Sequence, residues 1–208
     1  KMIDLYSSAT PNGRKISIML EELGVQYNAI HIDLEKKEQF SDFFSKISPS
    51  NKIPVIVDND KGITVFESGA ILLYLAEKYD KFLNKNYYWE IVQWLFFQMS
   101  YVGPMLGQAH QYLFYNPGKS KFAEEKSKGY TKHVYQILDE RLSSREYIVD
   151  EYSIADISIW PWIARFERHQ INLNEYTNVL RWYLEISNRT AVIKGYNVVG
   201  DYYEIPTV

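Results

Sequence analysis

Two short segments of this sequence combine residues that could hold a small acidic peptide. Ile53-Pro54 opens an apolar run at positions 55–57. Because proline cannot donate a hydrogen bond to a sheet, we expect Pro54 to start a strand, which leaves the backbone of Ile53 available to an extended ligand. Glu67-Ser68 precedes a long apolar helix, whose N-terminal N–H groups and positive dipole end favour a carboxylate. Each motif alone is also typical of an ordinary strand start or helix cap.

The turn after the first predicted strand offers hydroxyl and amide side chains but no thiol. It contains Ser7, Ser8, Thr10 and Asn12, and Thr10 is placed to cap the next helix. Proteins that exchange disulfides commonly carry a Cys-x-x-Cys pair at such a helix start. This chain has no cysteine, so any thiol must arrive with the substrate. The alternative is that Thr10 is only a cap and Asn12 only a turn residue.

Other site-forming motifs are absent or broken. The histidines at positions 31, 110, 133 and 169 show no i, i+4 pairing, and without cysteine there is no thiolate ligand, so we expect no metal. Residues 118–120 read Gly-Lys-Ser, as at the end of a phosphate-binding loop, but leucine occupies position 113, where that motif requires glycine. No G-x-S-x-G turn of a serine hydrolase occurs.

The elements that must position these residues form two patterns. Over residues 2–79 the sequence predicts a strand, a helix ended by Gly24, a second strand at 26–34, a weak helix at 39–47, a hairpin at 55–66 and a helix at 68–79. A strand, helix and strand joined by short links favour a parallel pair, and hence an α/β domain. We place this domain at residues 1–80 and a polar linker at 81–86.

Beyond the linker only helical periodicity remains. The pattern predicts helices at residues 87–100, 119–143, 153–169 and 177–189, with Gly103-Pro104 ending the first of them. Ser153 and Asp156 have the spacing of a capping box. Residues 190–208 lack periodicity, so we expect them to wrap the surface. This half, residues 87–208, is predicted to be an all-α domain.

Composition limits the classes of partner. The chain has 208 residues, of which 46% are hydrophobic, enough for a sizeable core. A net charge of -3 and a pI near 5.9 argue against nucleic acid as a partner. No apolar run exceeds residues 70–76, so we expect no membrane span. Without an apolar segment at its start, the chain is expected to be cytoplasmic.

These motifs together resemble the cytosolic glutathione transferases, and in detail the nu class of that family. The resemblance extends along nearly the whole chain. It is carried by ATPNG at positions 9–13, SPSNKIP at 48–54, FESGAILLYL at 66–75, GPMLGQ at 103–108 and the capping box. The family implies an α/β thioredoxin-like N-terminal domain, which binds glutathione, followed by an all-α helical-bundle C-terminal domain.

The resemblance also implies roles for single residues. Ile53, next to Pro54, would pair its backbone with the cysteinyl part of glutathione, and Glu67 and Ser68 would hold the γ-glutamyl end. Further positions match the family as follows: Gln39 and Lys52 at the glycyl end, Thr10 and Asn12 beside the sulfur, Lys126 reaching into the site of the partner subunit of a homodimer, and Gln108 and His110 on the side of the second substrate.

The activity that we expect is glutathione-dependent reduction of disulfide bonds, in which the glutathione thiolate replaces a protein cysteine. Glutathione serves as substrate or is bound as its disulfide, and no metal takes part. One alternative is a glutathione S-transferase or peroxidase that acts on electrophiles or hydroperoxides. The other is a glutathione-binding regulatory module without catalysis, because a yeast regulator of nitrogen catabolism has a similar region.

Overall fold

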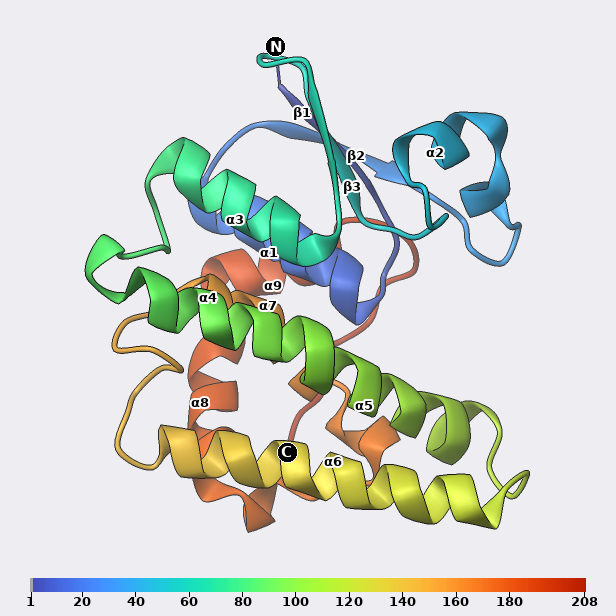
Figure 1. Cartoon of the computed structure of the whole chain (residues 1–208), viewed down its shortest axis with the longest axis vertical. Coiled ribbons are helices and arrows are strands. Elements are labelled where there is room, and N and C mark those ends of the chain that lie inside the picture. Colours follow the sequence, from blue (N-terminus) through green and yellow to red (C-terminus); the bar gives the residue numbers. More distant parts are fainter. Residues whose placement is uncertain (1) are drawn as a thin grey trace. The chain divides into compact units, whose positions relative to one another are not determined.

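A four-stranded mixed sheet forms the centre of the first part of the chain. The computed structural model describes residues 2–208, which divide into two units (Figure 1). The first unit contains the chain up to Leu83 together with Asn188–Ile205, and the second contains Asn84–Ser187 with Pro206–Val208. Residues 188–205, which the sequence pattern places with the helical half, therefore group with the sheet.

The sheet has the strand order β2-β1-β3-β4. β1 pairs with β2 in parallel and with β3 antiparallel, and β3 and β4 form an antiparallel hairpin. This arrangement confirms the βαβ unit, the hairpin and the thioredoxin-like fold expected from the sequence. The strand bounds are Ile3–Ser7 for β1, Tyr27–His31 for β2, Val55–Asp58 for β3 and Ile63–Phe66 for β4.

Three helices of the first unit follow the predicted pattern. α1 (Pro11–Leu23) begins after Thr10 and ends at Gly24, whose φ of 66° places it in the left-handed region that glycine tolerates. α2 (Asp42–Ile47) follows a short 3₁₀ turn, and α3 spans Ser68–Tyr79. α1 and α3 pack against each other, and Figure 1 shows α2 on the opposite side of the strands.

A fourth helix, α9 (Thr190–Tyr196), corrects the expectation of an irregular C-terminal segment. It packs closely on α1: a Cβ added to Gly195 would lie 2.5 Å from Cα of Ile18. The Oγ of Ser17 donates to the carbonyl of Gly195 at 2.5 Å, and Nε of Arg14 donates to that of Tyr196 at 2.8 Å. Seven residues span barely two turns, too few for a periodic pattern to stand out.

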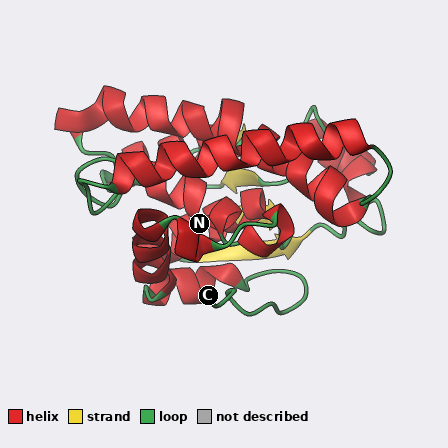
Figure 2. Cartoon of the chain, turned by 90° about the horizontal axis from the view of Figure 1, so that it is seen from below, coloured by secondary structure: helices red, strands yellow, loops and turns green. Residues whose placement is uncertain are grey.

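Every regular element of the second unit that the structure describes is a helix. Figure 2 draws the helices of the chain in red and its strands in yellow. Residues 88–115 form one continuous helical run, so the expected end at Gly103-Pro104 is wrong. Pro104 lies within this run, directly after the π-helical turn Gln98–Val102, in which the hydrogen bonds shift away from the α-helical pattern. The run comprises α4 (Tyr88–Phe97), α5 (Gly103–Ala109) and the π-helical turns Gln98–Val102 and His110–Tyr115.

The remaining helices of this unit are α6 (Lys121–Leu142), α7 (Ile154–Ile163) and α8 (Thr177–Ser187). The capping box at the start of α7 is confirmed: the carboxylate of Asp156 accepts hydrogen bonds from N–H of Ser153 at 3.0 Å and N–H of Ile148 at 2.9 Å. The indole of Trp182 on α8 donates to the same carboxylate at 2.8 Å. Within residues 2–208, no helix is both long and apolar enough to cross a bilayer.

Candidate active site

The strand register brings three predicted segments to one edge of the sheet. Tyr6, near the end of β1, pairs with Val55 at the start of β3, and Val55 pairs with Phe66 at the end of β4. The turn after β1, the residues before β3 and the residues after β4 therefore lie side by side. This edge carries seven of the predicted positions: Thr10, Asn12, Lys52, Ile53, Pro54, Glu67 and Ser68.

Thr10 is the N-cap of α1. Its Oγ1 accepts a hydrogen bond from N–H of Gly13 at 3.1 Å, and its backbone is extended, with φ −108° and ψ 163°. The hydroxyl hydrogen of Thr10 meets no acceptor within the described chain, so the hydroxyl can still donate to a ligand. Asn12 stands half-buried in the first turn of the same helix. Both side chains therefore sit where N–H groups and the helix dipole favour a negative charge.

The turn beneath Thr10 is tightly packed. Ser7 and Ser8 are buried, and Oγ of Ser8 donates to the carbonyl of Ile32. A Cβ added to Gly13 would lie 2.2 Å from O of Ser8 and 2.4 Å from Oγ of Ser7, closer than real contacts allow. Glycine is therefore required at position 13 for the helix to start against this turn.

The segment before β3 leaves Ile53 outside the sheet. The peptide bond between Ile53 and Pro54 is cis, and the ladder of β3 begins only at Val55. Ile53 thus lies before the first residue of the strand ladder, and its side chain packs against the cluster formed by Ile32, Phe44 and Val55. Pro54 is buried and Ile53 half-buried, so the segment is held from the core side.

Gln39 and Lys52 flank this segment. Nδ2 of Asn51 donates to the backbone carbonyl of Gln39 at 2.8 Å, which ties the 3₁₀ turn Glu38–Phe40 to the same edge. The side-chain Oε1 of Gln39 is buried without a hydrogen-bond partner in the described part of the chain. The hydroxyl of Ser48 fixes the backbone of Lys52 by donating to its carbonyl at 2.8 Å and accepting from its N–H at 3.1 Å. The ammonium of Lys52 stays exposed.

Glu67 and Ser68 form the start of α3. Glu67 is exposed and has φ 71° and ψ 118°, a backbone conformation that a residue with a side chain rarely adopts. Such strain concentrates at ligand-binding sites, where the surrounding structure enforces it. Ser68 is buried at the first helical position.

Lys15 is a residue of this region that the sequence analysis missed. Its side chain, on α1, is buried, and its Nζ donates to Oγ of Ser68 at 3.1 Å. Burial lowers the pKa of the Lys15 ammonium well below its ordinary value, and the negative charge of Glu67 raises it in part. The sequence carries no signal for this pair, because a lysine on a helix is usually solvent-exposed and its partner lies 53 positions away.

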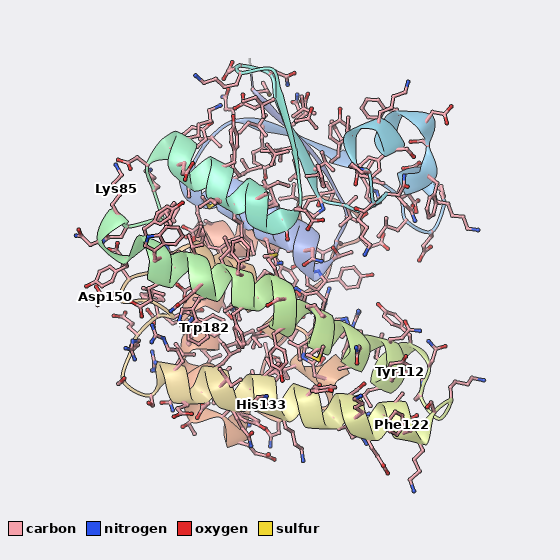
Figure 3. The ribbon with its side chains drawn as sticks, viewed as in Figure 1. Lys85, Tyr112, Phe122, His133, Asp150 and Trp182 are labelled. Atoms are coloured by element: carbon pink, nitrogen blue, oxygen red, sulfur yellow. The ribbon has the colours of Figure 1, made fainter. Side chains whose placement is uncertain are left out.

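Two of the predicted residues of the second unit line one small cavity. It has a volume of about 240 Å³, and Gln108 and Lys126 both border it. The ammonium of Lys126 lies 5.7 and 5.8 Å from the ring centres of Phe122 and Tyr130. Figure 3 labels Phe122 and Tyr112, which border the same cavity. A cation and an amide among aromatic rings suit an anionic or aromatic ligand.

His110 does not border that cavity. Its ring is buried and stacks on that of His169, with 2.9 Å between the two Nε2 atoms, and Nδ1 of His169 lies 2.8 Å from the hydroxyl of Tyr135. Burial, followed by the positive charges of Arg168 and Arg165, lowers the pKa of His110 to about 4. The ring is therefore neutral at pH 7 and turned toward the helical core.

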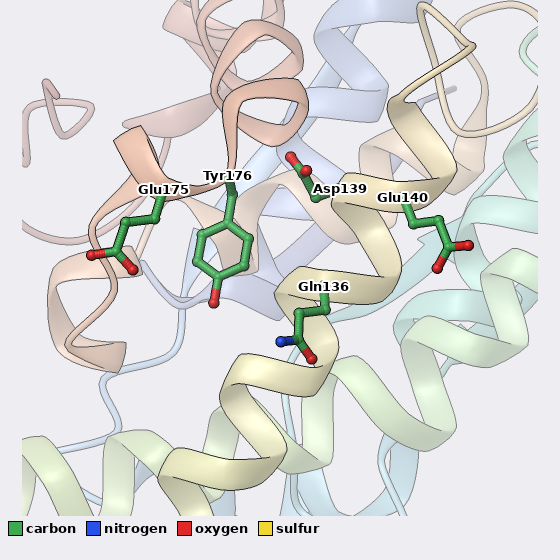
Figure 4. Close-up of a pocket in the computed structure, with 5 residues that line it drawn as sticks. All are labelled: Gln136, Asp139, Glu140, Glu175 and Tyr176. Carbon is green, nitrogen blue, oxygen red and sulfur yellow. The ribbon is translucent and has the colours of Figure 1, made fainter.

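A larger cavity of about 390 Å³ in the second unit is a poor match for an anionic peptide. Its lining combines carboxylates, an amide and a phenol (Figure 4): Gln136, Asp139, Glu140, Glu175 and Tyr176. Asp139 serves the fold, because its Oδ1 accepts from N–H of Asn178 at 2.9 Å, at the start of α8. In residues 2–208 no group of three or more histidine, aspartate or glutamate side chains is arranged to hold a metal ion.

Comparison with known proteins supports the interpretation of this geometry. The family models for the glutathione S-transferase N-terminal and C-terminal domains match residues 2–77 and 101–190. The disulfide-bond oxidoreductase YfcG of Escherichia coli strain K12 is 44% identical over 198 residues, which cover 91% of this chain and 92% of YfcG.

Two solved structures share the fold closely. A glutathione transferase from Pseudomonas putida, crystallised with one glutathione disulfide bound per subunit, is 37% identical, with a TM-score of 0.91 and coverage of 96% of this chain and 92% of that one. A glutathione transferase from Burkholderia graminis, with two glutathione molecules bound per subunit, is 34% identical, with a TM-score of 0.90 and coverage of 95% and 88%. With family models matching both halves and 44% identity along nearly its whole length to one relative, this chain belongs to the glutathione S-transferase family.

Proposed function

We propose that this protein reduces disulfide bonds with glutathione, using the thiolate of the bound tripeptide as its nucleophile. The observation that carries the proposal is the hydroxyl of Thr10, which caps α1 and still has a hydrogen to donate, in a chain without cysteine. The names of its relatives point the same way: YfcG is a disulfide-bond oxidoreductase, and the Pseudomonas putida protein binds glutathione disulfide. The nu-class assignment stays a prediction.

The free energies suffice for this role. A thiol of pKa about 8.5 is mostly protonated at pH 7, and lowering its pKa by about 1.5 units needs roughly 2 kcal/mol of preference for the thiolate. A helix dipole contributes about 0.3–1 kcal/mol, which is too little. A hydrogen bond to a charged acceptor adds about 1.5–3 kcal/mol. One donor from Thr10 or Asn12 is therefore enough.

The reaction proceeds in two exchanges. The thiolate of the first glutathione attacks one sulfur of the substrate disulfide, forming a mixed disulfide and releasing the other sulfur as a thiolate, which takes up a proton. A second glutathione thiolate then attacks the glutathione sulfur of the mixed disulfide. This step releases glutathione disulfide and the second substrate thiol. Two glutathione molecules are oxidised for each disulfide reduced, and no protein thiol is needed.

The test is glutathione-dependent reduction of 2-hydroxyethyl disulfide by the wild-type protein and by Thr10→Ala, Thr10→Ser and Asn12→Ala. We expect one or both alanine variants to lose about 10- to 100-fold in kcat/KM, the equivalent of one hydrogen bond to a charged group. Thr10→Ser keeps both the cap and the donor and should retain activity. Unchanged rates in both alanine variants would remove Thr10 and Asn12 from the mechanism.

The same preparations distinguish the other two functions. Faster turnover of an aromatic halide or a hydroperoxide than of the disulfide would favour a transferase or peroxidase. Glutathione binding without turnover of any of these substrates would favour a regulatory module.

We further propose that the protein is a cytoplasmic homodimer. Trp89 and Phe96 are seven residues apart on α4, hence on one helix face, and are 77% and 63% exposed. Large exposed aromatic side chains on one face are typical of a protein interface. In this dimer the exposed Lys126 contributes its ammonium to the site of the partner subunit. The cytoplasm keeps glutathione reduced, as the reaction requires.

Sedimentation of the wild-type protein and the Phe96→Glu variant tests the dimer. A charge placed in an apolar interface should shift Phe96→Glu toward the monomer, whereas Ile193→Glu, at an exposed apolar position on α9, is the matched control. A monomeric wild-type protein at micromolar concentration would contradict the dimer and leave the proposed reaction untouched.

A further inference from the structure

The buried amine of Lys15 contacts the first residue of α3 from the core side. Lys15 has 1% of its side chain exposed and Ser68 has 6%, and 3.1 Å separate Nζ of Lys15 from Oγ of Ser68. Lysine is among the residues that are rarely buried completely without a specific partner. Burying a hydrophobic side chain at this position of α1 would cost less free energy than burying an amine. The hydrogen bonds that the amine makes to its neighbours must therefore offset the cost of its burial.

The direction of this hydrogen bond fixes what Ser68 can offer. The hydrogen bond runs from Nζ of Lys15 to Oγ of Ser68, so Oγ of Ser68 is the acceptor. A hydroxyl that accepts a hydrogen bond becomes polarised, which strengthens its own donation to the next group in the chain. Ser68 also stands at the first position of a twelve-residue helix, where the backbone N–H groups favour an anion.

The groups around Ser68 match a zwitterion. Glu67, exposed at the N-cap of α3, brings a negative charge to the surface, and Lys15 places a buried N–H donor behind Ser68. The γ-glutamyl end of glutathione carries an ammonium and a carboxylate on one carbon. Glu67 suits the ammonium, and the chain from Lys15 to Ser68 suits the carboxylate.

We infer that Lys15 is a positioning residue for substrate recognition, which acts through Ser68 to select a γ-glutamyl group that carries a free α-carboxylate. The inference rests on the proposed use of glutathione. Lys15 does not touch the reacting sulfur. Its loss should therefore weaken binding of the carboxylate and leave the chemical step intact.

A ligand without that carboxylate provides the test. In 4-aminobutyryl-cysteinylglycine the amine of the γ-glutamyl residue is kept and its α-carboxylate is missing. Calorimetry on the full chain would compare this analogue with reduced glutathione for the wild-type protein, Lys15→Met, Ser68→Ala and the double variant. Lys46→Met, at an exposed position on α2, is the matched control.

For Lys15→Met we expect glutathione to bind about 10- to 100-fold more weakly, as for a lost hydrogen bond to a charged group, while the analogue binds within about twofold of its wild-type affinity. The preference for glutathione over the analogue should thus fall. The double variant should lose no more affinity for glutathione than Ser68→Ala alone. Lys46→Met should behave as wild type. In a kinetic assay, Lys15→Met should raise KM for glutathione and leave kcat within about twofold.

Three outcomes would overturn the inference. Wild-type affinity of Lys15→Met for both ligands removes Lys15 from recognition. An equal loss for both ligands assigns it a purely structural role. No glutathione binding by the wild-type protein overturns the proposed function, and this inference with it. If circular dichroism shows that Lys15→Met does not fold, Lys15→Gln, which keeps an N–H donor without the charge, is measured in its place.

Discussion

Each of the two units contains buried polar side chains joined by hydrogen bonds, but these hydrogen bonds end at different kinds of place. In the first unit the hydrogen bond from Lys15 runs to Ser68, which stands at the edge of the sheet where the candidate site lies. In the second unit both ring nitrogens of His169 are engaged, one by His110 and one by Tyr135, all within the helical core. One set ends at the candidate site and the other closes on itself.

The difference separates two uses of a buried polar group. A closed network stabilises the fold, and removing one member leaves its partners buried without a hydrogen bond. A network that ends at a site transmits orientation to a ligand, so removing a member should reduce affinity more than stability. The burial of a polar side chain alone therefore does not identify a functional residue. The residue at which its chain of hydrogen bonds ends is the better indicator.

The largest loss of stability is expected for Asp156→Ala in the second unit. The side chain is buried and accepts hydrogen bonds from Ile148, Ser153 and Trp182. Their donors would be left unpaired, which should lower the free energy of unfolding by about 3–5 kcal/mol. Urea unfolding at pH 7 measures it, with exposed Asp201→Ala as the control. A loss below about 1 kcal/mol would show that these three hydrogen bonds do not stabilise the second unit.

The next effect is a dependence of stability on pH that is due to His110. Because its pKa is lowered to about 4 in the folded protein, against about 6.5 when unfolded, the unfolded chain binds more protons between these values. The stabilisation is complete above pH 6.5 and is lost as the pH falls toward 4. Between pH 7.5 and 4.5 the wild-type protein should lose about 2.5 kcal/mol more than His110→Gln.

Urea unfolding at both pH values checks this difference, and His31→Gln, at an exposed position, is the control. Equal losses for the wild-type protein and His110→Gln would show that the ring of His110 takes up a proton in the folded state without penalty.

A smaller effect is expected for Tyr74→Phe in the first unit. The carboxylate of Asp58 is buried and accepts from the hydroxyl of Tyr74 at 2.5 Å, from Lys78 and from N–H of Asp60 at 3.0 Å. Burial alone raises the pKa of Asp58, but these donors outweigh it and bring the pKa to about 2. With the other donors in place, losing the hydroxyl should cost about 1.5 kcal/mol and leave KM for glutathione unchanged. A changed KM would link Asp58 to the site.

The smallest loss of stability is expected for Thr10→Ala, about 1 kcal/mol, the usual contribution of an N-cap. The same variant is expected to lose about 10- to 100-fold in kcat/KM for disulfide reduction, a larger effect than its loss of stability, which would group Thr10 with the residues that serve a ligand. Thermal unfolding and steady-state rates on one preparation measure both quantities. A stability loss as large as that of Asp156→Ala would place Thr10 among the structural residues instead.

The elements that the sequence predicted well carry their own local signals. α3 spans Ser68–Tyr79 as expected, and α1 starts after Thr10 and ends at Gly24. Proline, glycine and capping residues mark these helix ends independently of how the helices pack in the folded protein. The edge that gathers the candidate site also follows from the order of strands and helices, because a βαβ unit and a hairpin fix the register.

The features that were missed depend on contacts between distant residues. A lysine in an amphipathic helix is typical of a solvent-exposed position, and only the packing of α1 on α3 buries Lys15 beside Ser68. The orientation of the His110 ring is set by its contact with His169, which lies 59 residues later in the sequence. Sequence spacing cannot reveal such pairs, because they arise from tertiary packing rather than from local propensity.

The crowding around Gly13 limits what this helix start can become. Position 13 lies three residues after Thr10, where the second thiol of a Cys-x-x-Cys pair would stand. Since even a Cβ there would collide with the turn at Ser7 and Ser8, two substitutions cannot convert the site into an internal dithiol. In the proposed reaction the resolving thiol must come from solution. The extent of reduction would then follow the ratio of glutathione to its disulfide in the surrounding pool, so that the protein equilibrates its substrates with the pool and stores no oxidising equivalents of its own.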